Sequence, residues 1–299
     1  MKKQVRRFSI IVCSILLVSI VALLTSCKKT NVVSDLDFLD AETSEAENGL
    51  SYNYAYIGKF PQTVVSDELT INALNDLKVS KSSGFYEYEN NEYVKLVASP
   101  YALDYTFINK SVINKGQSYY FKVEPIKWRI ISSSSSSYQL LSEYLLFSDS
   151  YSSTPASYSE SSIRQYLNDT FYNSVFTEDE KAYINLTTLE DTATSDYVYL
   201  LSNKDYTNKK YGFTTSNAST NTRYSISTDY ARASGAYLNF DETYNGTGNY
   251  WCRQSGTTQP SFIARIGFDG STSSDLASHS NYKTVCVRMA LTIKPLTSK

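Results

Sequence analysis

Residues 121–141, FKVEPIKWRIISSSSSSYQLL, hold the pattern that decides the fold. Apolar and polar side chains alternate in residues 121–124 and 128–130, which predicts β-strand. The six serines of residues 132–137 separate this segment from a second strand-like run at residues 138–141. Because a polar run between two strand patterns is typical of a connecting turn, we predict a β-hairpin with a serine loop.

Three further segments favour strands. Residues 197–201 (YVYLL) form a short apolar run of the kind found in buried strands. Residues 262–268 (FIARIGF) lead into Asp269 and Gly270, a dipeptide typical of turns. In residues 285–292 (VCVRMALT) the large apolar side chains occupy every second position, so they would share one face of a strand. Strand patterns therefore continue almost to the end of the chain.

Helix signals are fewer and local. Residues 159–172 place apolar side chains at helical spacing after a serine, which predicts an amphipathic helix capped by Ser159. Thr177 and Glu180 have the spacing of a capping box, so a second helix is expected directly after Thr177. Residues 66–77 carry a weaker helical pattern. Because these helices do not alternate regularly with the strands, we predict an α+β fold with short antiparallel sheets.

The composition describes a folded chain. Of its 299 residues, 41% are hydrophobic and 19% are charged, which excludes disorder along the whole length. Residues 52–293 contain no internal repeat and no break in composition, so one domain of about 240 residues is the simplest organisation. The only histidine is His279, which excludes a metal site built from several imidazoles.

The N-terminus carries a targeting signal. Residues 1–7 are basic and residues 8–24 are almost wholly apolar, which is the layout of a secretory signal peptide. The apolar run is long enough to cross a bilayer, so an uncleaved anchor is the alternative. The sequence Leu-Thr-Ser-Cys that ends at Cys27 resembles the bacterial lipobox. That resemblance implies removal of residues 1–26, acylation of Cys27, and anchoring to the outer face of the cytoplasmic membrane.

Residues 27–50 would then form a tether between the lipid and a domain over residues 51–299. Six acidic residues lie between Asp35 and Glu47 with little apolar periodicity, so we expect a solvated spacer, with an acidic interaction segment as the alternative. Removal of residues 1–26 changes the formal charge from −2 to −6, since 24 basic residues then face 30 acidic ones. Such a chain lacks the clustered cations that phosphate contacts need, so we expect no nucleic-acid partner.

Several motifs follow one another along the chain. They are Ile57-Gly58-Lys59-Phe60-Pro61-Gln62; Pro125-Ile126-Lys127-Trp128-Arg129-Ile130; a helix pattern of Ser161, Ile163, Arg164, Leu167, Asn168, Phe171 and Tyr172; Thr228-Asp229-Tyr230-Ala231; Tyr250-Trp251-Cys252-Arg253-Gln254-Ser255; and Val287-Arg288-Met289-Ala290-Leu291. In this order they resemble a family of bacterial extracytoplasmic domains of unknown function, the DUF6273 type. The resemblance spans residues 56–293.

The resemblance implies a C-type-lectin-like fold of the formylglycine-generating-enzyme subclass. The chain departs from the family pattern at Met289, where proline is usual, and at Cys252, where leucine is usual. Cys252 and Cys286 fall in two strands that the family places in its C-terminal sheet, and they are the last thiols left after processing. An exported chain meets an oxidising environment, so we predict a disulfide between them, with two buried thiols as the alternative.

The sequence gives little support to catalysis. Related enzymes of this fold bind copper through two nearby cysteines or iron through several histidines, and the chain has neither set. The acidic pairs Asp241 with Glu242 and Asp269 with Asp275 would suit calcium or acid–base chemistry, but their surroundings are also those of ordinary turns. We expect His279 to be an ordinary loop residue, and we expect no catalytic residue, metal or cofactor.

Aromatic residues give the main indication of function. The 27 tyrosines are twice the 13 phenylalanines, and tyrosine combines a rigid contact surface with a hydroxyl group. In lectin-like folds the late loops form the ligand face. The resemblance therefore implies a ligand surface made from Tyr237, Tyr244, Tyr250, Trp251, Arg253 and Tyr282. Two alternatives remain. The Trp and Arg residues would also suit structural roles in the core, and a genome rich in A and T would also raise the number of tyrosines.

We therefore expect a bacterial surface lipoprotein whose domain binds an extracellular glycan or protein without catalysing a reaction. Two alternatives come from other functional classes. One is a metal-dependent oxidase of the same fold. The other is a substrate-binding lipoprotein of a transporter, which would need two lobes and a hinge that the sequence does not indicate.

Overall fold

The computed structural model describes residues 42–45, 50–81, 84–255, 261–272 and 277–295. The expected signal peptide, the lipobox and Cys27 lie outside the described residues. Within the described ranges, each helix is too short or too polar to traverse a bilayer.

Strands dominate the described chain. They are β1 (Glu42–Glu45), β2 (Ser51–Val64), β3 (Tyr86–Tyr88), β4 (Asn91–Val97), β5 (Ser118–Ser133), β6 (Tyr138–Ser142), β7 (Phe147–Ser148), β8 (Ile184–Asn185), β9 (Thr187–Leu189), β10 (Thr194–Asp196), β11 (Val198–Leu200), β12 (Leu238–Asn239), β13 (Thr247–Gly248), β14 (Tyr250–Ser255), β15 (Phe262–Ile266), β16 (Ala277–His279), β17 (Cys286–Val287) and β18 (Met289–Ile293).

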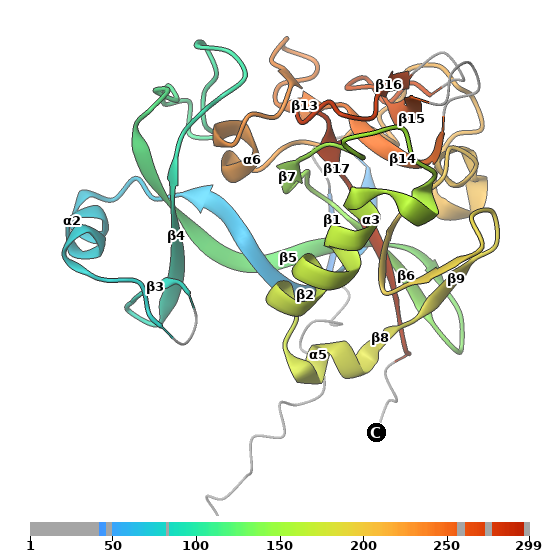
Figure 1. The fold of residues 1–299 in the computed structure, drawn as a ribbon, viewed down its shortest axis with the longest axis horizontal. Helices are drawn as coiled ribbons and strands as arrows, with labels where there is room; N and C mark the ends of the chain where they lie inside the picture. Colours follow the sequence, from blue (N-terminus) through green and yellow to red (C-terminus); the bar gives the residue numbers. More distant parts are fainter. Residues whose placement is uncertain (1–41, 46–49, 82–83, 256–260, 273–276, 296–299) are drawn as a thin grey trace, which may run out of the picture. The chain divides into compact units, whose positions relative to one another are not determined.

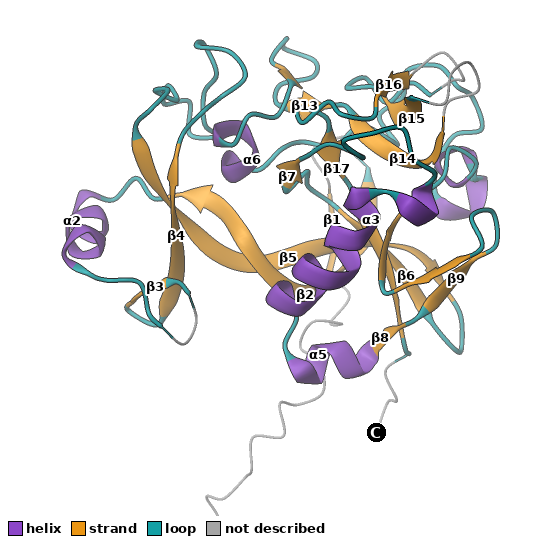
Figure 2. Ribbon diagram, viewed as in Figure 1, coloured by secondary structure: helices purple, strands orange, loops and turns teal. Residues whose placement is uncertain are grey.

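The helical elements are short. They are α2 (Glu68–Asp76), η2 (Tyr158–Glu160), α3 (Ser162–Tyr166), η3 (Leu167–Phe171), α4 (Tyr172–Val175), α5 (Glu178–Tyr183), η4 (Asp205–Thr207), η5 (Lys209–Tyr211) and α6 (Asp229–Ala233). Figure 2 shows these helices among sheets whose pairs are almost all antiparallel, so the predicted α+β class is confirmed.

The larger sheet is built around β5. Its central order is β1-β2-β5-β6-β18-β11, and each neighbouring pair is antiparallel. The start of β5 pairs with β4 and its end pairs with β6, so one long strand supports two parts of the domain. Figure 1 shows α2, β3 and β4 at one end of β2 and β5, with β6 and β9 at the other. The predicted hairpin of β5 and β6 is confirmed, but its loop is shorter than predicted, because Ser132 and Ser133 pair with β6 as the end of β5.

The smaller sheet has the order β16-β15-β14-β17-β7, in which only β14 and β17 run parallel. The strand predicted over residues 285–292 is divided between the two sheets, since β17 joins the smaller one and β18 the larger. Arg288 lies at the division. Its Nε donates to the Ser142 carbonyl at 3.0 Å and its Nη1 to the Arg223 carbonyl at 2.7 Å, so the fully buried guanidinium fixes the crossing.

The helix predicted over residues 159–172 is interrupted. It consists of the 3-10 turn η2, helix α3, the π-helical turn η3 and helix α4. The N-cap is Ser161 and not Ser159, since the Ser161 hydroxyl accepts from the Arg164 N–H. In the π-helical turn the Asn168 side chain accepts from Tyr197 N–H at 2.8 Å and donates to the Val198 carbonyl at 2.9 Å. A tertiary contact to β11 therefore coincides with the departure from a regular helix.

The capping box is confirmed. Thr177 Oγ1 accepts from the Glu180 N–H at 3.2 Å, and Glu180 Oε2 accepts from the Thr177 N–H at 2.8 Å. Glu180 Oε1 also accepts from the N–H of Gly58 at 2.8 Å, which ties α5 to β2. Gly58 has φ +69°, and a Cβ there would lie 2.6 Å from the Phe176 ring, so this contact requires glycine. The weaker helix over residues 66–77 is present as α2.

The expected tether is not wholly a spacer. Within residues 27–50, the four residues of β1 pair antiparallel with β2, from Glu42 opposite Tyr54 to Glu45 opposite Ser51. The reason is that β2 would be an edge of the larger sheet without β1, and an unpaired edge offers backbone N–H and C=O groups to a neighbouring segment. The structured domain therefore begins before residue 51.

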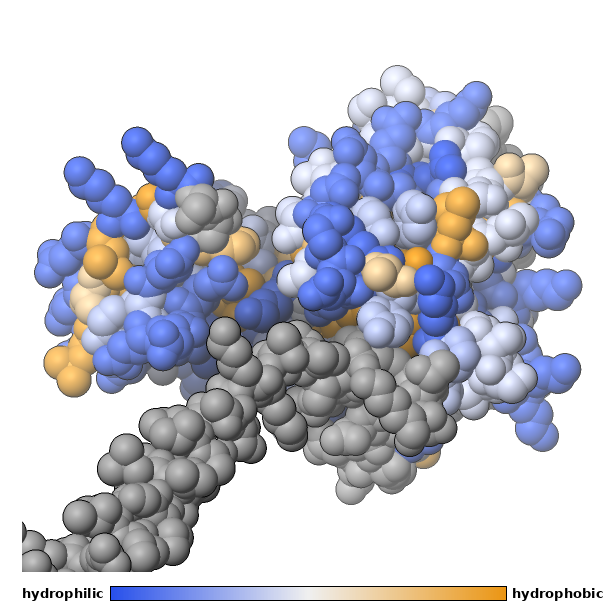
Figure 3. Space-filling model, turned by 90° about the horizontal axis from the view of Figure 1, so that it is seen from below, coloured by the Kyte–Doolittle hydropathy of each residue, from blue (hydrophilic) through white to orange (hydrophobic). Residues whose placement is uncertain are grey.

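The core lies between the two sheets and the helices. One cluster of buried hydrophobic residues extends through both sheets, and it contains Trp128, Trp251 and Phe171. A small second cluster of Leu74, Tyr93 and Tyr120 holds α2 against β4 and β5. On the face seen in Figure 3, most of the described surface is hydrophilic and hydrophobic side chains are scattered.

Candidate functional site

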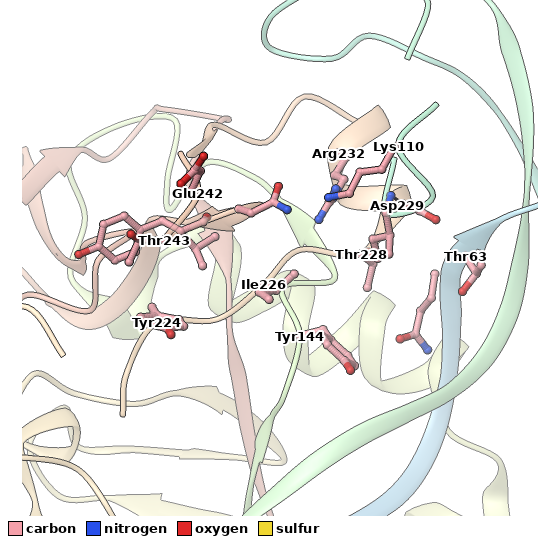
Figure 4. A pocket seen from close by; sticks show the side chains of 15 residues that line it. Thr63, Lys110, Tyr144, Tyr224, Ile226, Thr228, Asp229, Arg232, Glu242 and Thr243 are labelled. Carbon is pink, nitrogen blue, oxygen red and sulfur yellow. Dashed lines mark hydrogen bonds between the residues drawn. The ribbon is translucent and has the colours of Figure 1, made fainter. Parts of the chain in front are cut away.

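A pocket of about 480 Å³ lies where β2, α6 and two loops meet, and we call it the Arg232 pocket (Figure 4). One loop contains Ile108 and Lys110, and the other spans residues 242–247. Its volume is in the range of sites that hold small ligands. The pocket is lined by Gln62, Thr63, Ile108, Lys110, Tyr144, Tyr224, Ile226, Thr228, Asp229, Arg232, Glu242, Thr243, Tyr244, Asn245 and Thr247.

Helix α6 positions the two charged groups at the base of the pocket. Thr228 caps the helix through a bond to the Ala231 N–H, and Asp229 and Arg232 follow three residues apart on one face. Both are 2% exposed. Asp229 Oδ2 accepts from the Val64 N–H at 3.1 Å and Oδ1 from the Ile108 N–H at 2.6 Å. Burial raises the pKa of Asp229, and these two hydrogen bonds offset part of that rise.

Arg232 has only neutral hydrogen-bond partners. Its Nε donates to Ser227 Oγ at 3.2 Å, and its Nη1 donates to the Thr106 carbonyl at 3.1 Å. Its Cζ lies 5.4 Å from the centre of the Phe240 ring. Among the described residues no carboxylate oxygen lies within 4.0 Å of this guanidinium, and no acceptor is present for Nη2. Burial lowers the pKa of Arg232, but an arginine remains charged at neutral pH.

Gly246 makes room for this guanidinium. A Cβ at Gly246 would lie 2.2 Å from Arg232 Nη2, which is far inside van der Waals contact. The residue also has φ +86°, a conformation that only glycine adopts at little cost. The backbone of the 242–247 loop therefore lies directly against Nη2 and leaves no space for a side chain there.

Aromatic and amide groups form much of the remaining wall. Tyr144, Tyr224 and Tyr244 line it, and the Tyr224 and Tyr244 rings meet edge to face with centres 6.0 Å apart. Gln62 is held by its Nε2, which donates to the carbonyls of Glu124 and Pro125 at 3.0 Å. The pocket thus offers ring faces beside hydrogen-bonding groups.

The charged groups at the mouth come from different loops. In Figure 4 the side chains of Lys110 and Arg232 reach toward the same part of the pocket, whereas Glu242 projects from the loop across it. Lys110 is exposed and has φ +71°, an unusual conformation for a residue other than glycine. The pocket therefore has a cationic end and an anionic end.

A second cavity, of about 700 Å³, lies beside β11 and η4, and we call it the Arg253 groove. Arg253 is 7% exposed and its guanidinium is fully used. Nε donates to Asp191 Oδ1 at 2.9 Å, Nη1 to the Leu200 carbonyl at 2.9 Å, and Nη2 lies 3.1 Å from Asp205 Oδ2. Burial opposes the charge of Arg253, but these carboxylates raise its pKa overall.

Two residues of the predicted ligand surface lie in the core. Tyr250 and Trp251 are fully buried, so this part of the prediction is corrected. The Tyr250 hydroxyl donates to the Arg223 carbonyl, and Trp251 Nε1 donates to the Asp149 carbonyl at 2.8 Å. The reason is that β14 is covered on both faces, and both side chains fix neighbouring backbone. Arg253, on the same strand, forms the ion pairs of the groove.

The other predicted ligand residues lie at the surface but do not form one face. Tyr244 lines the Arg232 pocket. Tyr237 packs edge to face against Tyr101, with ring centres 4.9 Å apart. Tyr282 packs 5.5 Å from the ring of His279, which is exposed.

Cys252 and Cys286 are free and fully buried in the structure, so the predicted disulfide is not seen. Burial raises the pKa of Cys286 to about 12 and raises the pKa of Cys252 as well. The structure therefore shows the alternative that the sequence left open, two buried thiols.

The acidic pairs do not form metal sites among the described residues. No three His, Cys, Asp or Glu side chains gather there as a metal centre would require. Asp241 and Glu242 are exposed. Asp269 accepts from the Ser219 hydroxyl and from Ser271 N–H at 2.9 Å, so it orders a turn, and Asp275 lies outside the described residues.

Of the charged residues of the Arg232 pocket, sequence reasoning singled out Glu242 alone, as half of an acidic pair, and it missed Lys110, Asp229 and Arg232. A signal was present for Asp229, which stands in the Thr-Asp-Tyr-Ala motif, and for Gln62, which ends the first motif. Arg232 directly follows the former motif. Lys110 lies in no motif, and only the fold brings its loop to α6.

Comparison with known proteins identifies the family. Residues 135–295 match the model of a family described as Domain of unknown function (DUF6273), which covers more than half of the 299 residues. No curated protein and no solved structure matches the chain. The match includes α6 and the 242–247 loop, whereas Gln62 and Lys110 precede it. The chain therefore belongs to the DUF6273 family.

Proposed function

We propose that this chain is a bacterial surface lipoprotein whose domain binds an extracellular saccharide without catalysing a reaction. The domain is of the C-type-lectin-like type, and the ligand occupies the Arg232 pocket. The observation that carries the proposal is the lining of this pocket, which places Tyr144, Tyr224 and Tyr244 beside amide and hydroxyl side chains. Sugars present apolar ring faces and many hydroxyl groups, and this lining offers a partner for each.

The pocket has a size that suits a short oligosaccharide. Its volume of about 480 Å³ leaves room for a few sugar rings. The walls are preorganised, because Gln62, Asp229 and Tyr244 are each fixed by contacts within the domain. Fixed walls lower the entropy cost of binding.

A glycan array tests the binding. The domain without its signal is applied to the array beside two variants, Tyr244→Ala in the pocket and Tyr282→Ala outside it. We expect Tyr244→Ala to lose most of the bound signal, because ring stacking contributes about 1 kcal/mol or more. Tyr282→Ala is the matched control, as it removes an exposed tyrosine of the same late segment. Equal loss in both variants, or no bound saccharide, would reject the pocket as the site.

Lipid attachment is tested separately. Cells that express the full chain are grown with a palmitate analogue, and the label on the protein is measured. We expect label on the wild type and none on Cys27→Ala, because the acylated thiol is absent. Label that persists in the variant would reject the anchor and leave the saccharide proposal standing.

A further inference from the structure

The Arg232 pocket contains a buried cation with an unused donor. Most buried arginines of the described chain have their donors satisfied: those of Arg129 and Arg253 meet carboxylates, and those of Arg223 meet five carbonyls. Arg288 Nη2 lacks an acceptor, but that residue lies in the core. Arg232 differs because it lines a cavity while its Nη2 has no acceptor in the described residues.

Lys110 adds a second positive charge to the same end of the pocket. Its backbone has φ +71°, held by a bond from its N–H to the Phe107 carbonyl at 3.0 Å. Beside it, Asn109 Oδ1 accepts from the Ser111 N–H at 3.0 Å and fixes the turn. A residue kept in a costly conformation whose side chain reaches into a cavity is typical of a functional position. The turn presents the ammonium group toward Arg232 (Figure 4).

The fixed charges at this end favour a ligand with a single negative charge. Two cations face one internal anion, Asp229, whose oxygens accept from two backbone N–H groups. The remaining charge is close to +1. Glu242, on the loop across the pocket, disfavours a more negative group. A carboxylate carries one charge and pairs well with guanidinium and ammonium donors.

We propose that the Arg232 pocket recognises the carboxylate of an acidic sugar, which accepts a hydrogen bond from Arg232 Nη2 and pairs with Lys110. This inference rests on the proposed saccharide-binding function and adds the class of sugar. Gly246 contributes to this site, because a side chain there would displace the Arg232 guanidinium from its position in the pocket.

The test uses ligands that differ only in charge. Oligosaccharides of glucuronate, galacturonate and mannuronate are each compared with their methyl esters and with neutral oligosaccharides, by titration calorimetry on the wild-type domain. We expect at least one free acid to bind about tenfold more tightly than its ester, since a hydrogen bond to a charged group is the stronger kind. If acids and esters bind equally, the inference is wrong and saccharide binding stands. If no saccharide binds, the proposed function itself is wrong.

Variants then locate the interaction. Lys110→Asn removes the charge and keeps a residue that accepts positive φ, so it folds as the wild type does. We expect it to reduce the preference for acid over ester by about threefold to fivefold. Arg232→Lys keeps the charge but shifts the donor, and it reduces the preference further. Lys115→Asn changes an exposed lysine that does not line the pocket, and it leaves the preference unchanged. An equal effect of Lys115→Asn would show that the charge of the whole domain is responsible, and would overturn the inference.

Discussion

Two buried arginines line cavities on this domain, and they are held in opposite ways. Arg253 donates to a carbonyl and pairs with two carboxylates, and these carboxylates neutralise its charge within the groove. Arg232 has neutral hydrogen-bond partners only, which Nε and Nη1 use, and it lines its pocket without an ion pair. Both side chains are less than a tenth exposed, so burial does not distinguish them. The hydrogen-bond acceptors around a buried arginine therefore distinguish a structural role from a ligand-binding one.

The largest expected effect is the difference in stability between variants that lack one arginine or the other. Arg253→Met leaves two carboxylates without their cation, and we expect a loss of about 3 kcal/mol in the free energy of unfolding. Arg232→Met removes two hydrogen bonds to neutral acceptors and a longer-range attraction to Asp229. Because no carboxylate is bonded directly to Arg232, we expect a smaller loss, of about 1 kcal/mol. Urea unfolding of both variants measures the two losses. A greater loss of stability for Arg232→Met than for Arg253→Met would show that Arg232 also stabilises the fold, and would contradict the contrast between them.

The second expectation concerns Gly246. Gly246→Ala should cost about 2 kcal/mol, because the new Cβ meets both an unfavourable φ and the Arg232 guanidinium. Gly116→Ala is a matched control, since Gly116 has φ +85° and nothing lies within 4 Å of its added Cβ. It should cost only the conformational part, about 1 kcal/mol. Thermal unfolding compares them, and equal losses would mean that Arg232 moves aside freely.

The third expectation is a pH dependence of opposite sign at two carboxyls. Burial raises the pKa of Asp229, so the folded state takes up this proton first, and the contribution of Asp229 to stability rises as the pH falls through its folded pKa. The free energy of unfolding of the wild type, relative to Asp229→Asn, should therefore increase from pH 7 toward pH 4. An unchanged or decreasing difference would contradict the environment described for Asp229.

Asp269 is the control for that measurement. Burial opposes its charge, but hydrogen bonds from Ser219 and Ser271 lower its pKa overall. Its contribution is present above the unfolded pKa of 3.8 and is lost as the pH falls through the lower, folded pKa. The difference between the wild type and Asp269→Asn should therefore stay level down to about pH 4 and decrease below it. Chemical unfolding at a series of pH values gives both curves.

The smallest effect is expected from Lys110. Because its side chain is exposed and asparagine accepts its backbone conformation, Lys110→Asn should change the free energy of unfolding by less than about 0.5 kcal/mol. Urea unfolding checks this value. A larger loss would show that the lysine supports the loop itself, and the contrast with Arg253 would then weaken.

The sequence predicts what local chemistry decides. The capping box of Thr177 and Glu180 needs residues three apart, and the serine hairpin needs two adjacent strand patterns, so both are present as expected. The π-helical turn is different, because the Asn168 side chain binds a strand about thirty residues later. No local pattern contains that contact.

The candidate site was predicted only in part, for a related reason. Tyr244 is in the late segment where a ligand surface was expected, and it does line the pocket. Tyr250 and Trp251 belong to a strand with both faces covered, where alternation no longer separates exposed from buried positions. Arg232 and Lys110 come together only through the packing of α6 against a loop more than a hundred residues earlier.

The two free thiols also allow local unfolding of the domain to be measured. Cys252 and Cys286 are sealed in adjacent strands of the smaller sheet, and their raised pKa values keep them in the unreactive thiol form. A thiol-specific reagent can reach them only when β14 and β17 become accessible to solvent. The labelling rate of each cysteine, followed by mass spectrometry, therefore measures how often the smaller sheet opens and exposes the core to water.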